Sequence, residues 1–130
     1  MSASFGPAGN AENFPYKSSA DAPRWMAELG LDCYEYQCGK GIHVGEETAR
    51  KVGASAVEHG ITLSLHAPYF INLANPDPDS QEKTAGYVLA ACQVARWMGA
   101  KLSIRTSNDI RAEVFRQFLE IDWQASLNYH

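Results

Sequence analysis

The residue of this chain best placed for chemistry is a histidine that ends a short apolar run. The run opens the stretch SLHAPYFINLANPD, ends at His66 and turns at once through Ala67 and Pro68. A neutral imidazole at a strand end is a common metal ligand or general base. The alternative is that His66 only caps the strand through a backbone carbonyl. The residue types leave both interpretations open.

Three large apolar residues follow this histidine in a segment expected to be a loop. They are Tyr69, Phe70 and Ile71, although loops run over the surface and are normally polar. One interpretation is that they fold back as an apolar lid over the next helix. The other places them at a functional rim, where aromatic side chains stack on bases or wedge between base steps.

Further candidate residues are less specific. The glycine-rich loop at residues 6–9 allows close backbone approach to a ligand, but it is also ordinary turn chemistry. Glu35 lies inside a predicted strand and faces either a barrel interior or solvent. His43 and His59 are expected to be structural or solvated, and His59 suits the end of a helix.

The elements that position these residues follow one repeated order. The first three predicted helices each end at a glycine and lead within a residue or two into a strand. The predicted helices span residues 22–29, 46–59, 79–98 and 109–121, and the predicted strands span residues 4–6, 31–37, 61–66 and 101–104. The helix at 79–98 carries Tyr87, Val88, Ala91, Val94, Ala95 and Met98 on one side. This alternation predicts parallel βα units with right-handed crossovers.

Two α/β architectures fit parallel βα units in a chain of this length. One is a small doubly wound sheet, and the other is part of a (β/α)8 barrel, which typically needs roughly 250 residues. No GxGxxG follows the first predicted strand, so nothing favours a dinucleotide fold. We therefore predict the first half of a TIM barrel. In either architecture the loops after Gly6 and Gln37 meet His66 at the carboxyl ends of the strands.

Composition excludes several classes of protein. The 130 residues are 45% hydrophobic and 20% charged, as in one ordinary globular domain. A net charge of -4 gives no basic footprint for nucleic acid, which counts only weakly against DNA, because a local basic patch can lie on an acidic protein. Cys33, Cys38 and Cys92 have no metal or disulfide spacing, which favours a reducing compartment. Without a signal peptide or an apolar run of roughly 18 residues, we expect a cytoplasmic protein with no membrane partner.

Several segments together resemble the endonuclease IV family. They are FGPAG, LDCYEYQCGKG, EETARKVGASAVEHGITLSLHAPYFINLANPD and a helix that ends in WMGA. This family comprises zinc-dependent apurinic/apyrimidinic endonucleases on a xylose-isomerase-like TIM barrel, and HAPYFINLA is the most specific part of the match. The resemblance places an endonuclease IV-like region at residues 1–101 and an unmatched tail at residues 102–130.

The resemblance implies roles for individual residues. His66 would be a zinc ligand, and Tyr69 and Phe70 would belong to the loop that enters the DNA minor groove at an abasic site. Asn72 and Gln37 would lie nearby as further DNA-binding residues. Enzymes of this family use zinc to activate a hydroxide that cuts the phosphodiester 5′ to the abasic site, a step of DNA base-excision repair.

The resemblance ends abruptly at the start of the fourth predicted strand. That strand reads KLSIRTSND, with Arg105 near the position where the family has a histidine, and the family's later ligands have no counterpart. We expect a truncated, frame-shifted or short form that binds zinc weakly and does not cleave abasic DNA by itself. Two alternatives are a non-catalytic half-barrel that self-associates through open sheet edges and a sugar isomerase or epimerase on the same barrel. The PYFINLA loop favours DNA over sugar.

Overall fold

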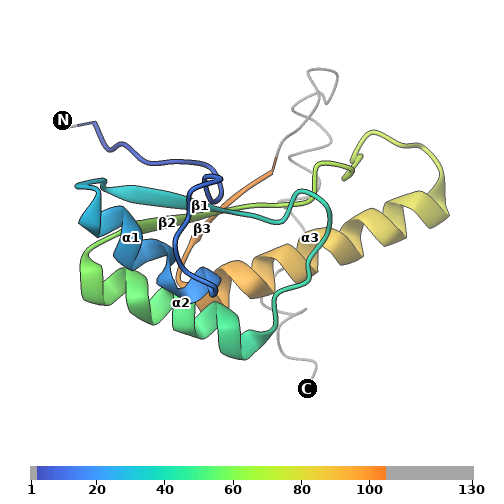
Figure 1. The fold of residues 1–130 in the computed structure, drawn as a ribbon. Helices are drawn as coiled ribbons and strands as arrows, with labels where there is room; N and C mark the ends of the chain where they lie inside the picture. Colours follow the sequence, from blue (N-terminus) through green and yellow to red (C-terminus); the bar gives the residue numbers. More distant parts are fainter. Residues whose placement is uncertain (1–2, 105–130) are drawn as a thin grey trace.

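The structure, a computed structural model, describes residues 3–104. Three helices lie on one side of a three-stranded sheet (Figure 1). The elements in chain order are η1 (Ser19–Asp21), α1 (Ala22–Glu28), β1 (Cys33–Gln37), α2 (Glu46–His59), β2 (Thr62–His66), α3 (Pro78–Met98) and β3 (Lys101–Ser103). The strands are parallel and in the order β1-β2-β3. The predicted parallel βα units are therefore confirmed. Arg105 and the helix predicted at 109–121 lie outside the described residues.

The helix ends are set by local backbone chemistry. α2 begins at Glu46 and ends at His59, as predicted. Gly60 and Gly99 end α2 and α3 with φ of 69° and 64°, a left-handed conformation that glycine adopts without a steric penalty. α3 begins at Pro78, one residue before the predicted start, because the Asp77 carboxylate caps it.

The first predicted strand does not form a regular strand. The segment at residues 4–6 lies beside β1, and the bridge between Ala8 and Glu35, in a parallel sense, is isolated. The Glu35 amide donates to the Pro7 carbonyl at 3.0 Å. Pro7 has no N–H that could donate to β1, so the hydrogen-bonded ladder between the two segments cannot continue. The prediction of a strand at 4–6 is wrong, although the segment runs where a first barrel strand would run.

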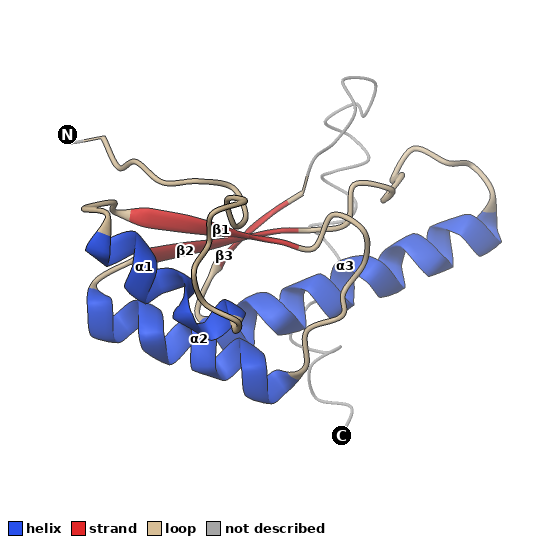
Figure 2. Ribbon diagram, in the orientation of Figure 1, coloured by secondary structure: helices blue, strands red, loops and turns tan. Residues whose placement is uncertain are grey.

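Alternation along the strands gives the sheet two different faces. Leu63 and Leu65 of β2 point to the helices and are 5% and 0% exposed, whereas Ser64 and His66 point to the opposite side and are half-buried. We call these the covered face and the open face. The helices all lie against the covered face of the sheet (Figure 2). The largest fully buried side chains are Met26, Leu65, Val52, Pro23 and Pro68.

Within residues 3–104, no helix is long and apolar enough to span a membrane.

Candidate functional site

The carboxyl ends of the strands meet at one edge of the sheet, as predicted. Gln37 pairs with His66, and His66 pairs with Ser103, across the three strand ends. The chain beyond each strand end is tied to its neighbour. The Cys38 amide donates to the His66 carbonyl at 2.9 Å, and the Ala67 amide donates to the Ser103 carbonyl at 2.9 Å. Gln37 and His66 therefore lie side by side on the open face.

One ring nitrogen of His66 is hydrogen-bonded to the backbone, and the other is available to a ligand. Its Nδ1 lies 2.7 Å from the Ala67 carbonyl oxygen, which can only accept a hydrogen bond. Nδ1 of the neutral ring must therefore carry the proton, which leaves the Nε2 lone pair free. This is the arrangement common in metal-bound histidines. The two interpretations of His66 are thus compatible, because one nitrogen caps the backbone and the other is available to a ligand.

The described residues do not make a metal site by themselves. Within residues 3–104 there is no group of three or more His, Cys, Asp or Glu side chains that could hold an ion. A catalytic zinc site typically has three protein ligands. His66 is suited to be one ligand, and the others would have to come from outside this range.

A short polar network lies beside His66 on the open face. Gln37 Nε2 donates to Glu35 Oε1 at 2.7 Å, and Ser64 Oγ donates to Glu35 Oε2 at 3.4 Å. A carboxylate only accepts, so the amide oxygen of Gln37 faces away from Glu35. The orientation of Glu35, which the sequence left open, is therefore toward the open face. In a closed barrel this face is the interior.

The loop after β2 divides its apolar residues between two roles. Ile71 and Leu73 are 7% and 8% exposed, whereas Tyr69 and Phe70 are 61% and 45% exposed. The two buried side chains anchor the loop on the core. The two exposed rings stand out near the strand ends. Ile71 is therefore a core residue, whereas Tyr69 and Phe70 are exposed, and a functional role for these two rings stays a prediction.

Two neighbouring segments fix the exposed rings. The Tyr69 amide donates to the Gly39 carbonyl at 3.3 Å, and a Cβ at position 39 would lie 3.1 Å from Tyr69 Cδ1. The loop after β1 therefore packs closely on Tyr69. On the other side, Phe70 contacts Tyr87 of α3, with ring centroids 4.9 Å apart. Tyr87 was predicted on the apolar side of its helix, but it is 43% exposed.

Asn72 is exposed on the same loop. Its Oδ1 accepts a hydrogen bond from the Ala74 amide at 3.1 Å, which is a local turn. The side-chain oxygen thus serves the loop itself. A contact from Asn72 to DNA stays a prediction.

A hollow of about 260 Å³ opens at the carboxyl end of β1. Its lining residues are Tyr36, Gln37, Cys38, Gly41, His43, Val44, Gly45 and Thr48. Cys38 is only 3% exposed, and burial raises the pKa of its thiol. A thiol with a raised pKa is a poor nucleophile and a poor metal ligand. Cys38 is therefore poorly suited to act as a nucleophile or a metal ligand at this end of the sheet.

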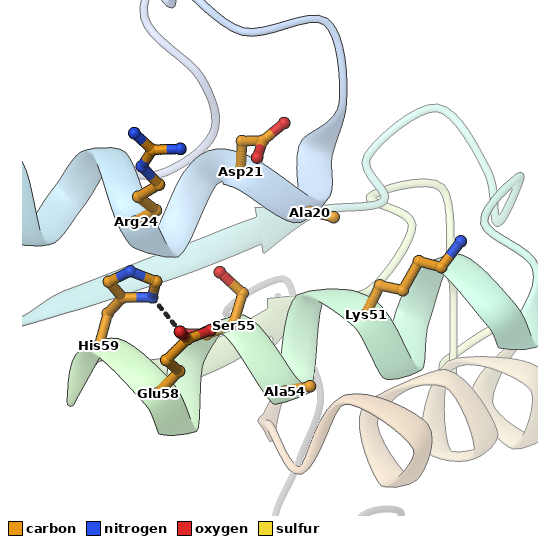
Figure 3. A pocket seen from close by; sticks show the side chains of 8 residues that line it. All are labelled: Ala20, Asp21, Arg24, Lys51, Ala54, Ser55, Glu58 and His59. Atoms are coloured by element: carbon orange, nitrogen blue, oxygen red, sulfur yellow. Dashed lines mark hydrogen bonds between the residues drawn. The ribbon is translucent and has the colours of Figure 1, made fainter.

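A larger hollow of about 540 Å³ lies between α1 and α2 on the helical side of the sheet (Figure 3). The two cationic side chains in its lining, Arg24 and Lys51, are engaged along their own helices. Arg24 pairs with Glu28 at 3.0 Å and Lys51 pairs with Glu47 at 2.7 Å. His59 Nδ1 lies 2.8 Å from the backbone oxygen of Ser55, the dashed contact in Figure 3. This hollow does not include any residue of the strand ends.

The parallel sheet agrees with a family-level comparison. The model of the xylose isomerase-like TIM barrel family matches residues 23–121, so the chain belongs to that family. The predicted barrel fold is thereby confirmed. No curated protein matches the chain.

Two solved structures share the fold. A D-psicose 3-epimerase with D-tagatose from Clostridium cellulolyticum H10 superposes with a TM-score of 0.57 at 20% identity, over 76% of this chain and 32% of that one. A D-psicose 3-epimerase in the presence of D-fructose gives a TM-score of 0.56 at 15% identity, over 69% of this chain and 32% of that one. The chain thus spans about a third of the length of these epimerases.

Proposed function

We propose that this chain supplies the first strands of a barrel enzyme that hydrolyses DNA 5′ to abasic sites. The observation that supports the proposal is the exposure of Tyr69 and Phe70, at 61% and 45%, on a loop whose next apolar residues are buried. A side chain that wedges into DNA must be free to reach a base step. Unstacking a step costs a few kcal/mol, and stacking on one aromatic returns about 1–3 kcal/mol per base. Two exposed rings therefore offset most of the cost.

The remaining strand-end residues have distinct roles in this proposal. His66 contributes Nε2 as one zinc ligand, with the other ligands supplied from outside residues 3–104. Gln37 offers its amide oxygen as an acceptor, because its nitrogen already donates to Glu35 at 2.7 Å. Asn72 supports the loop that carries the rings and adds a polar group beside them.

A sugar isomerase or epimerase is the second candidate. Both solved structures compared above are D-psicose 3-epimerases, one of them with D-tagatose. The open face also offers Glu35, Gln37, Ser64 and His66, which are hydrogen-bonding groups of the kind that hold sugar hydroxyls. The comparisons favour this candidate over DNA, and the exposed rings favour DNA.

The two candidates are separated by the double substitution Tyr69→Ala with Phe70→Ala. The chain and the double variant are titrated with a duplex that contains a stable abasic analogue and, separately, with D-psicose. We expect abasic-duplex affinity to fall roughly 10-fold or more, since each lost stacking contact is worth about 1–3 kcal/mol. Zinc content and melting temperature stay unchanged. Val57→Ala, at an 85% exposed position on α2, is the matched control for losing an exposed apolar side chain.

The opposite result identifies the alternatives. A lower melting temperature with unchanged DNA affinity means that the rings serve as a lid, and the DNA proposal is then wrong. Saturable D-psicose binding that is lost in Glu35→Ala and retained in the ring double variant supports the sugar candidate instead.

A further inference from the structure

Tyr87 of α3 lies against the exposed ring of Phe70, which belongs to the loop after β2. We propose that Tyr87 is a positioning residue that holds the Phe70 ring in the orientation presented to a ligand. Tyr69, Phe70 and Tyr87 then form one continuous surface, here called the aromatic row. The identity of the ligand that binds the aromatic row rests on the proposed function, but the contact between Tyr87 and Phe70 does not.

The aromatic row is held by two nearly perpendicular ring contacts. Tyr69 and Phe70 have centroids 6.2 Å apart at 74°, and Phe70 and Tyr87 have centroids 4.9 Å apart at 81°. These are edge-to-face arrangements, which aromatic rings prefer because of their quadrupoles. The three side chains are 61%, 45% and 43% exposed, so these contacts do not fill the core. Single exposed apolar residues are normal, but three exposed rings joined by two successive contacts form a surface.

The loop backbone alone does not fix the Phe70 ring. The backbone is anchored on both sides of this residue, by the Tyr69 amide to the Gly39 carbonyl and by burial of Ile71. These anchors set the position of the Phe70 Cα, but they do not restrict its side-chain torsions. Tyr87 supplies a rigid neighbour from a 21-residue helix. A ring held before binding loses less rotamer freedom when the ligand arrives, which raises affinity without a new contact.

Three substitutions on α3 separate positioning from stability. Tyr87→Ala removes the ring and introduces the best helix former, so α3 is not weakened. Tyr87→Phe keeps the ring and removes only the hydroxyl, and it should behave as the original chain does. Leu89→Ala is the matched control, because Leu89 is 42% exposed on the same helix but two residues further along, on a different side.

The first measurement uses the chain without any ligand. The χ1 torsion of Phe70, followed by NMR couplings with selectively labelled phenylalanine, should occupy one rotamer. We expect several rotamers in Tyr87→Ala and one rotamer in Tyr87→Phe and Leu89→Ala. A single Phe70 rotamer in Tyr87→Ala, the same as in the original chain, would overturn the inference.

The second measurement is affinity for the abasic-analogue duplex. Tyr87→Ala should weaken binding about 2- to 12-fold, the range of an aromatic pair contact. In a Phe70→Ala background the same substitution should have no further effect. Fully additive losses of affinity would mean that Tyr87 touches the ligand directly, which contradicts a positioning role. A positioning role is also contradicted if Phe70→Ala weakens binding and Tyr87→Ala does not. If the Tyr69 and Phe70 double variant binds DNA normally, the proposed function fails, and the rotamer measurement on Phe70 still decides the role of Tyr87.

Discussion

The two faces of the sheet are built from the same strands and differ in almost every property. On the covered face, Tyr34, Leu63 and Leu65 are 3%, 5% and 0% exposed beneath the helices. On the open face, Glu35 and Ser64 at the intervening positions are half-buried and joined by a hydrogen bond. A step of one residue along a strand therefore moves from packing to polar chemistry. Core packing and exposed polar groups are thereby separated in a sheet only three strands wide.

The largest effect is expected from truncation on the covered face. Leu65→Ala leaves a cavity at a position that is 0% exposed and should lower the free energy of unfolding by about 2–5 kcal/mol. Ser64→Ala, one residue away, loses a 3.4 Å hydrogen bond and should cost about 1 kcal/mol or less. Urea unfolding of both variants measures the difference. Equal losses of unfolding free energy in the two variants would mean that the two faces contribute equally to stability.

A smaller effect is expected where two helices under the covered face meet. A Cβ at Gly53 of α2 would lie 2.6 Å from the Met98 carbonyl oxygen of α3, so Gly53→Ala should destabilise by about 1–3 kcal/mol through overpacking. Gly86→Ala is the matched control, because no neighbour lies within 4 Å of a Cβ there. Within helix α3 that change should stabilise by up to about 1 kcal/mol. Thermal melts test both, and stabilisation by Gly53→Ala would show that the helices are packed less closely.

The covered face should also respond to alkaline pH through Tyr34. Burial, with a smaller effect of Tyr36, raises the pKa of Tyr34 to about 12, and its hydroxyl donates to Asn10 Oδ1 at 2.7 Å. The unfolded tyrosine loses its proton near pH 10, so the folded state holds this proton more tightly. Its contribution to stability is therefore fully present below about pH 10 and is lost as pH rises toward about 12.

Melting temperatures between pH 9 and 11.5 measure this loss. Tyr34→Phe removes the titrating group and should give a shallower fall over the same range. Identical slopes for the two proteins would mean that Tyr34 is not shielded from water by the covered face.

The parts of the fold that local chemistry decides were predictable from the sequence. Gly60 and Gly99 announce the ends of α2 and α3, because each adopts a left-handed conformation that other residues rarely adopt. The alternation in TLSLH places His66 at a strand end on a face opposite to the leucines. The strand predicted at residues 4–6 failed for a local reason as well, since Pro7 cannot donate to a ladder.

The parts that depend on distant neighbours were not predictable. Tyr69, Phe70 and Ile71 are similar residue types, and only the packed loop decides which of them is buried. Tyr87 has helical spacing with the core residues of α3, yet it lies at the edge of that side and contacts Phe70 instead. Glu35 could have faced either way until its hydrogen bonds to Gln37 and Ser64 were known. Each of these required contacts between residues far apart in the chain.

The two edge strands of the sheet differ in whether a further strand can pair with them. Along β1, the N-terminal segment occupies the edge with Gly6 pressed so close that a Cβ would lie 1.7 Å from the Cys33 carbonyl oxygen. Among the described residues, β3 pairs only with β2, so its outer amides and carbonyls can template another strand. A separately produced fragment that carries later barrel strands should therefore complement this chain at β3 and not at β1, extending the sheet in the order of the chain.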